Sequence, residues 1–154
     1  MKKALLSNGI KFIYKFRQGD ISSFCAGVSA GALNEQKFKI GTAHAVEHMI
    51  SKGTKSKDEA SINSELSELF GFENAMTNFP YTVYYGTCLS EKLEQAVQLY
   101  SDILINPLFP EKGFKEEIDI ICQELKEWKD DSAADCQAQL FKNCFSGSRI
   151  SELI

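Results

Sequence analysis

The first thirty residues carry short apolar runs separated by turn-forming residues, a pattern that predicts β-strands. Asn8-Gly9 favours a two-residue hairpin turn between a strand at 4–6 and a strand at 10–16. A third strand is predicted over 21–29. Two further strands are predicted over 72–77 and 81–88, with Pro80 at the turn between them.

Other segments repeat apolar residues at helical spacing. Helices are predicted over 42–51 and from Ser56 to Gly71, with Glu59 placed to complete a capping box. Two more cover 90–106 and 133–145. The helix between these two opens at Pro110, and its apolar residues are spaced by 4, 3, 4 and 3: Phe114, Ile118, Ile121, Leu125 and Trp128. The order of elements predicts an α+β layered domain, with a mostly antiparallel sheet covered by helices.

The composition narrows the class of partner. Of the 154 residues, 44% are hydrophobic and 25% are charged, as is typical of a globular domain. The net charge of −4 disfavours binding to nucleic acid or to an anionic membrane. No apolar run approaches the ~18 residues of a membrane span. The apolar N-terminal stretch is interrupted by Asn8, Gly9 and Lys11, short of a signal peptide.

The cysteines indicate a reducing compartment. Five cysteines, an odd number without a CxxC pair, argue against a disulfide framework and against a zinc ribbon. We therefore expect free thiols that are mostly buried as small hydrophobic groups, and a cytoplasmic location. The five are Cys25, Cys88, Cys122, Cys136 and Cys144.

The two histidines of the chain fall in one motif, His44-Ala45-Val46-Glu47-His48. Residues four apart lie on the same face of a helix, so both imidazoles can reach one metal ion. Glu47 lies on the adjacent surface, where it can act on a water molecule at that ion. This is the H-x-x-E-H pattern, the reverse of the more common H-E-x-x-H.

Two other interpretations of the motif are weaker. The first is that both histidines are structural, hydrogen-bonded side chains and that the glutamate is an ordinary surface residue. A structural role suits a lone histidine better than this spaced pair. A structural zinc site is usually rich in cysteine and four-coordinate, and no cysteine lies near the pair in the sequence. A catalytic zinc site instead needs a third protein ligand and an open position.

The long helix offers two candidates for that third ligand. Glu124 lies beside the apolar stripe, and Glu117 lies seven residues before it, two turns along the same side. A carboxylate on the core-facing side of a helix is costly unless it is paired or bound to a metal. The pattern alone leaves two alternatives open, because a small rotation of the helix would place both carboxylates in solvent.

Several segments, in order along most of the chain, resemble the inverted-motif zinc peptidases of the pitrilysin, insulysin and mitochondrial processing peptidase family. Ser51 departs from this pattern, because many members have phenylalanine there, and we expect the change to affect packing only. The matching segments are Asn8-Gly9, AGALNE at 30–35, GTAHAVEHM at 41–49, KGT at 52–54, NAMT at 74–77, TVY at 82–84 and the helix that holds Glu117 and Glu124.

The resemblance implies a zinc endopeptidase that cleaves peptides or small proteins. It assigns His44, His48 and Glu124 as the ligands of Zn²⁺ and Glu47 as the general base, with Glu117 supporting the site from the outer shell. Members bind an extended peptide as an added strand at a sheet edge. The segment that lines that site in the family matches Asn74, Ala75, Met76 and Thr77, which from the residues alone is only a turn-flanked edge strand.

The resemblance also implies a larger enzyme. Complete members pair a catalytic half with a similar half that lacks the zinc motif, in the same chain or in a partner subunit, and the two close over the peptide. We therefore expect residues 1–154 to be one N-terminal zinc-binding peptidase domain, incomplete at its C-terminus, where 151–154 resemble part of a continuing element. The alternatives are a non-catalytic metal-binding or scaffold subunit, and a fragment that binds metal without hydrolysing peptides alone.

Overall fold

The computed structural model describes residues 1–152, and its first element is the predicted hairpin. Strands β1 (Lys2–Leu5) and β2 (Lys11–Tyr14) pair antiparallel, with Lys2 opposite Tyr14. Gly9 takes φ 85°, and its N–H donates to the carbonyl of Leu6 at 2.9 Å. The predicted two-residue turn is wrong in length: Leu6 pairs with Ile10 across a three-residue loop, 7–9, in which only Gly9 has a positive φ. This is the type I turn followed by a glycine bulge, the next most common hairpin connection. The second strand is shorter than the predicted 10–16, because its partner β1 begins only at Lys2, opposite Tyr14.

A second sheet has three antiparallel strands: β3 (Ile21–Val28), β4 (Phe70–Thr77) and β5 (Thr82–Leu89). Their order is β3-β5-β4, so β4 is an edge strand, as predicted. Alternate residues of β5, from Thr82 to Cys88, are buried against the helices. This period of two is the signature of a sheet with one covered face.

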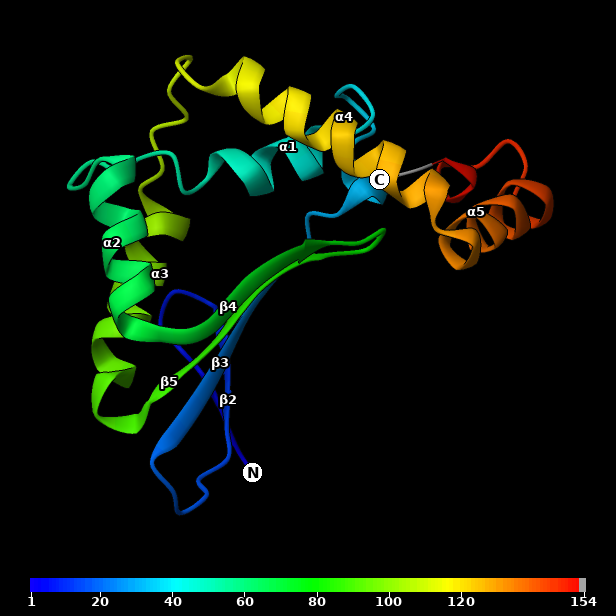
Figure 1. The fold of residues 1–154 in the computed structure, drawn as a ribbon. Coiled ribbons are helices and arrows are strands. Elements are labelled where there is room, and N and C mark those ends of the chain that lie inside the picture. Colours follow the sequence, from blue (N-terminus) through cyan, green and yellow to red (C-terminus); the bar gives the residue numbers. More distant parts are fainter. Residues whose placement is uncertain (153–154) are drawn as a thin grey trace.

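Helices α2 (Glu59–Leu69) and α3 (Leu93–Ile105) cover that face of the sheet (Figure 1). Helices α1 (Thr42–Met49) and α4 (Phe114–Asp130) run antiparallel to each other past the end of the sheet where β4 finishes, and α5 (Ser132–Cys144) follows α4 (Figure 1). Short 3₁₀ turns complete the described elements: η1 (Ala32–Asn34), η2 (Ser90–Lys92) and η3 (Arg149–Ser151). The predicted α+β layered architecture is confirmed.

The hydrophobic core lies between the sheet and the pair α2 and α3. Ile62 and Ile103 are its fully buried members, each contributing about 1.5–3 kcal/mol from burial. The rings of Phe24 and Phe70 pack against Tyr100 at centroid distances of 4.8 and 5.5 Å. Ile50, the residue after α1, is also in this core. The core therefore anchors the end of the helix that carries both histidines.

The start of α2 corrects one prediction. Asp58, rather than Ser56, is the N-cap, and its side chain accepts a hydrogen bond from the N–H of Ser61 at 2.9 Å. The hydroxyl of Ser56 instead donates to Asp102 of α3 at 2.7 Å. Because this contact with α3 holds Ser56 in the loop before α2, the helix begins later than the local sequence suggests. Glu59 does not complete a capping box and instead pairs with Lys52.

The cysteines are free thiols, as predicted, but only Cys88 is buried. The expectation that they are mostly buried is wrong. Cys25 lies on the face of β3 opposite Phe24, away from α2 and α3, and the other three lie on the exposed sides of α4 and α5. Within residues 1–152, no helix is both long and apolar enough to cross a bilayer. The predicted continuation over 151–154 extends into residues outside the described part of the chain.

Candidate metal centre

Both histidines project from one face of α1. His44 and His48 lie one turn apart, as their spacing predicts, and their Nε2 atoms are 3.1 Å from each other. Their side chains are 16% and 15% exposed, so the two rings are largely shielded but still reach a cavity. Two Nε2 atoms at this distance point at one common position.

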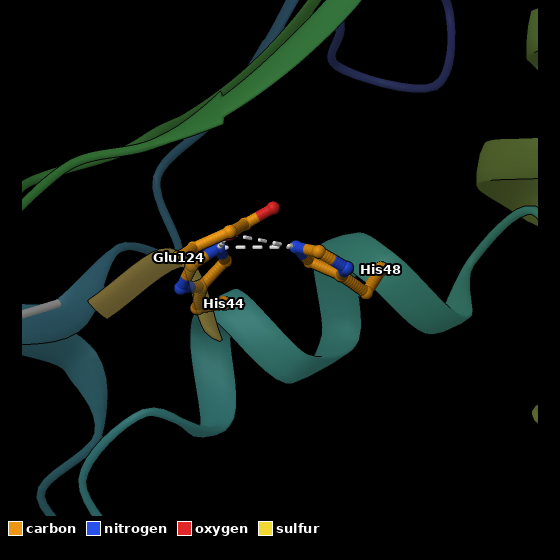
Figure 2. A group of neighbouring side chains, drawn as sticks. All are labelled: His44, His48 and Glu124. Carbon is orange, nitrogen blue, oxygen red and sulfur yellow. Dashed lines mark hydrogen bonds and ion pairs between the residues drawn. The ribbon is translucent and has the colours of Figure 1, made fainter. Parts of the chain in front are cut away.

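Glu124 approaches the two rings from α4. Its Oε2 atom lies 3.4 Å from Nε2 of His44 and 3.6 Å from Nε2 of His48. Figure 2 shows the three side chains converging from the two helices. The open question about α4 is thereby answered, because its Glu117 and Glu124 side faces α1. Glu117 is buried at 8% exposure, and the side chain of Glu124 remains 42% exposed.

The three ligand atoms fit a tetrahedral zinc ion. Bonds of about 2.0–2.1 Å in a tetrahedron separate ligand atoms by about 3.3–3.4 Å. The separations among His44, His48 and Glu124 are 3.1, 3.4 and 3.6 Å, which bracket that value without movement of the backbone. Two imidazoles and one carboxylate are also a donor set of catalytic zinc sites, which keep the fourth position open.

Glu117 stands behind His48 and links it to two further residues. Its Oε2 lies 3.0 Å from Nδ1 of His48, and its Oε1 pairs with Nζ of Lys52. Lys52 also pairs with Glu59, at 2.6 Å. Burial alone would raise the pKa of the Glu117 carboxyl, but the hydrogen bonds from Lys52 and His48 outweigh it and lower that pKa. Glu117 is thus held as a carboxylate against the back of the His48 ring.

Glu47 faces the sheet. Its Oε2 accepts a hydrogen bond from the hydroxyl of Thr77, the last residue of β4. Tyr84 on β5 also lies nearby: burial, and next the charge of Glu47, raise the pKa of its phenol to about 12. The candidate base is therefore held between α1 and the end of the sheet, beside the two histidines.

The edge strand β4 borders the same cavity. The N–H of Asn78 donates to the carbonyl of Tyr81 at 2.8 Å. Since bonded and non-bonded pairs alternate along an antiparallel ladder, the pair of Ala75 and Tyr84 is a non-bonded one, and the N–H of Ala75 points outward from the sheet. The side chain of Asn74 accepts this N–H at 2.8 Å. The strand therefore has outward-facing backbone groups along its unpaired edge, beside the histidines.

All nine site residues predicted from the sequence line one cavity of about 500 Å³. They are His44, Glu47, His48, Asn74, Ala75, Met76, Thr77, Glu117 and Glu124. The structure brings the candidate ligands, the candidate base and the strand segment together from three separate parts of the chain. Ser51, Lys52, Glu59 and Trp128 are among the other residues of this lining.

Sequence reasoning missed three charged residues around the centre. The sequence places Lys52 only in a motif and Glu59 only in a helix cap. The ion pair of Lys52 with Glu117, which also links Glu59 to the site, requires α4 to pack against α1. Glu35 was also missed. It is buried, and its carboxylate accepts hydrogen bonds from the N–H groups of Gly41, the N-cap of α1, and of Ala43 in its first turn. A signal was available, since Gly41 begins this helix without a side chain that could cap it.

Comparison with known proteins agrees with this geometry. The model of the insulinase family of peptidases, M16, matches residues 12–153. The chain belongs to this family. The M16 match confirms the resemblance drawn from the spaced motifs, and it extends over almost the whole chain.

Individual M16 relatives are similar at about one-third identity. The mitochondrial-processing peptidase subunit beta of Dictyostelium discoideum is 33% identical, covering 99% of this chain and 33% of its own length. The subunit beta of Caenorhabditis elegans is 33% identical over 79% of this chain and 27% of its own length. An uncharacterized zinc protease of Rickettsia felis is 31% identical over 81% of this chain and 31% of its own. The chain thus spans about a third or less of these relatives.

Proposed function

We propose that this chain is the zinc-binding catalytic part of an M16 endopeptidase, which hydrolyses peptides or small proteins with water. The observation that carries the proposal is the convergence of His44, His48 and Glu124 to within 3.1–3.6 Å beside Glu47. The Rickettsia felis relative is named a zinc protease, which supports the same cofactor here.

In this proposal His44, His48 and Glu124 hold the zinc ion, and Glu117 orients His48 through Nδ1. A bound zinc ion would supply Lewis-acid polarisation of the scissile carbonyl and would lower the pKa of a water molecule toward about 7. Glu117 keeps the Nδ1 proton of His48 engaged, so that Nε2 is the nitrogen presented to the ion.

Glu47 is the proposed general base. The hydroxyl of Thr77 donates to one oxygen of its carboxylate and thereby restrains the group. The carboxylate takes a proton from the attacking water and returns it to the leaving amine, which is the two-step role of a general acid–base residue. Thr77 sits at the end of β4, so the base lies next to the strand proposed to bind substrate.

The substrate is proposed to bind as an added strand along β4. An extended peptide would exchange backbone hydrogen bonds with the edge formed by Asn74, Ala75, Met76 and Thr77. The outward N–H of Ala75 is one such group, and the Asn74 side chain that now accepts it would be displaced. Because β4 ends at Thr77 beside Glu47, a peptide in this position passes the base.

We also propose that a second, homologous half without the zinc motif completes the enzyme, in the same chain or as a partner subunit. Two of the relatives are named as subunits, and the chain spans about a third or less of their length. The cytoplasmic location stays a prediction that rests on the free cysteines.

The test separates zinc binding from hydrolysis. We expect the wild-type chain and Glu47→Gln to bind one zinc ion each after dialysis, measured by atomic absorption. Peptide cleavage should be lost only in Glu47→Gln, measured with fluorogenic peptides in the presence of a homologous half that lacks the motif. Glu116→Gln is the matched control, because it makes the same chemical change on an exposed part of α4.

Two results would overturn the proposal. A wild-type chain that binds no zinc would exclude the metal centre, and cleavage that survives in Glu47→Gln would exclude the assigned base. Zinc binding without cleavage, even beside the homologous half, would favour the alternative of a non-catalytic metal-binding or scaffold subunit.

A further inference from the structure

The first turn of α1 is capped from outside the helix. Gly41, its N-cap residue, has φ 87° and no side chain with which to accept the exposed N–H groups. Both oxygens of the Glu35 carboxylate do so instead: Oε2 accepts from the N–H of Gly41 at 3.2 Å and Oε1 from that of Ala43 at 2.7 Å. A negative charge at a helix N-terminus also interacts favourably with the helix dipole.

Glu35 is buried, with a side chain only 6% exposed, and a buried carboxylate is costly without a partner. Arg149 of η3 is that partner, although it lies 114 residues away in the sequence. Its Nε and Nη2 atoms both donate to Oε2 of Glu35, at 3.3 and 3.1 Å. Ser148 caps η3, since its hydroxyl accepts the N–H of Ile150, and this turn holds Arg149 in place.

Glu35 itself stands on a rigid support attached to the sheet. The N–H groups of Ala32 and Leu33 donate to the carbonyls of Asn78 and Phe79, in the turn between β4 and β5. The two segments touch so closely that a Cβ atom on Gly31 would lie 2.1 Å from the carbonyl oxygen of Asn78. The turn follows directly after Thr77, so one support fixes both the cap of α1 and the end of β4.

The contacts of this cap reach the metal ligands through one peptide bond. Ala43, whose N–H is held by Glu35, is the residue before His44. The N–H of Ala45, the residue after His44, donates to the carbonyl of Gly41 at 2.9 Å. A shift of the first turn would therefore move His44 relative to His48, which is anchored one turn later by Glu117.

We propose that Glu35 is a positioning residue for the metal centre and that Arg149 holds it in that role. The buried pair fixes the first turn of α1 against the sheet, so the segment 148–152 sets how tightly His44, His48 and Glu124 hold zinc. This inference rests on the proposed function, because it concerns the same metal site. It adds two residues that act on the metal ligands through the backbone of α1.

The test compares zinc affinity with the stability of the metal-free fold. The variants are Glu35→Gln, Arg149→Gln, their combination and Arg149→Lys, with Glu116→Gln and Arg17→Gln as exposed controls of the same chemistry. The zinc dissociation constant is measured by competition with a chelating indicator. The folded fraction without metal is measured by circular dichroism, and affinities are compared for folded protein.

We expect each glutamine variant to weaken zinc binding about tenfold, the lower end of the effect of removing groups that support a metal ligand. The double variant should be no weaker than the single ones, since the two residues act as a unit. Arg149→Lys should recover part of the affinity, because lysine keeps the charge but offers one direct donor in place of two. The controls should stay within twofold of wild type.

A charge-reversed chain, Glu35→Arg with Arg149→Glu, distinguishes positioning from a simple ion pair. An ion pair that only stabilises the fold would be restored by reversal. Under the proposal zinc binding stays weak, because an arginine cannot accept the N–H groups of Gly41 and Ala43 and carries the wrong charge for this helix end. If a variant is unfolded without metal, Arg149→Lys carries the comparison.

Restored affinity in the reversed chain, or a zinc affinity of Glu35→Gln within twofold of wild type, would overturn this inference alone. A wild-type chain that binds no zinc would overturn both this inference and the proposed function. The two failures are therefore distinguishable from the wild-type measurement.

Discussion

Replacing Glu117 by glutamine keeps the size of the side chain and removes the charge between His48 and Lys52. The carboxylate now meets Nδ1 of His48 at 3.0 Å and the ammonium group of Lys52 with its other oxygen. Outer partners of a metal-bound histidine are worth about 10–100-fold in metal affinity. We therefore expect zinc binding weaker by that factor, which corresponds to about 1.4–2.7 kcal/mol.

The same change should also lower the free energy of unfolding, but by less than the loss of a fully buried ion pair. Removing one member of a buried ion pair costs about 3–5 kcal/mol when the other charge is left uncompensated. Lys52 keeps its contact with Glu59 at 2.6 Å and is 18% exposed, so we expect a loss of about 1–2 kcal/mol in the free energy of unfolding without metal. The loss of zinc affinity, measured on folded protein, should therefore come in addition to this loss of stability.

Two measurements check this reasoning. Competition with a zinc chelator at pH 7 gives the affinity, and urea denaturation in the presence of a chelator gives the stability of the metal-free chain. Glu116→Gln, the exposed neighbour, should change neither by more than about 0.5 kcal/mol. A zinc affinity of Glu117→Gln within twofold of wild type would refute the argument, because His48 would then not depend on Glu117 for its orientation.

Three further predictions concern the strand edge, the loop before α2 and the core. Ala75→Pro removes the outward N–H of β4 without breaking a bond to β5, so kcat/KM for peptide cleavage should fall by about 2–13-fold, one hydrogen bond, at unchanged zinc affinity. Equal kinetics would argue against peptide binding along this edge. Hydrogen bonds from Ser56, Thr54 and Asn106 lower the pKa of Asp102 from its ordinary 3.8, so its stabilisation is present above that value and is lost as the pH falls through the lowered one. Asp102→Asn should therefore flatten the acid limb of stability in urea titrations below about pH 4, and an unchanged limb would contradict the assignment. Ile62→Ala should cost about 2–5 kcal/mol in urea denaturation, and a loss under 1 kcal/mol would mean that the core closes over the cavity.

Local patterns identified the elements and half of the site. The i, i+4 spacing places both histidines on one face of any helix, whatever surrounds it. Asn8-Gly9 marks the hairpin turn, and Gly9 takes its left-handed position, although the loop has three residues and not the predicted two. Glu124 was different: its distance from the apolar stripe allowed either the core or solvent, and the family resemblance rather than the periodicity assigned it.

Errors occurred where a distant segment competed with a local rule. Ser56 is a good helix cap in isolation, but its hydroxyl donates a hydrogen bond to Asp102 of α3, and Asp58 caps the helix instead. The exposure of Cys25 follows from which face of the sheet the helices cover, since both faces of a strand satisfy the same alternation.

By itself, the sequence determined the helix with its two histidines and the acidic residue between them, the hairpin, and the edge-strand segment as a strand. These features depend on residues within a turn or two of one another. Only the tertiary structure decided that α4 turns Glu117 and Glu124 toward α1, that Lys52 closes the network behind His48, and that Arg149 holds the cap of α1. Those contacts join residues 65 or more positions apart, so their formation depends on how helices pack around the sheet and not on any local pattern.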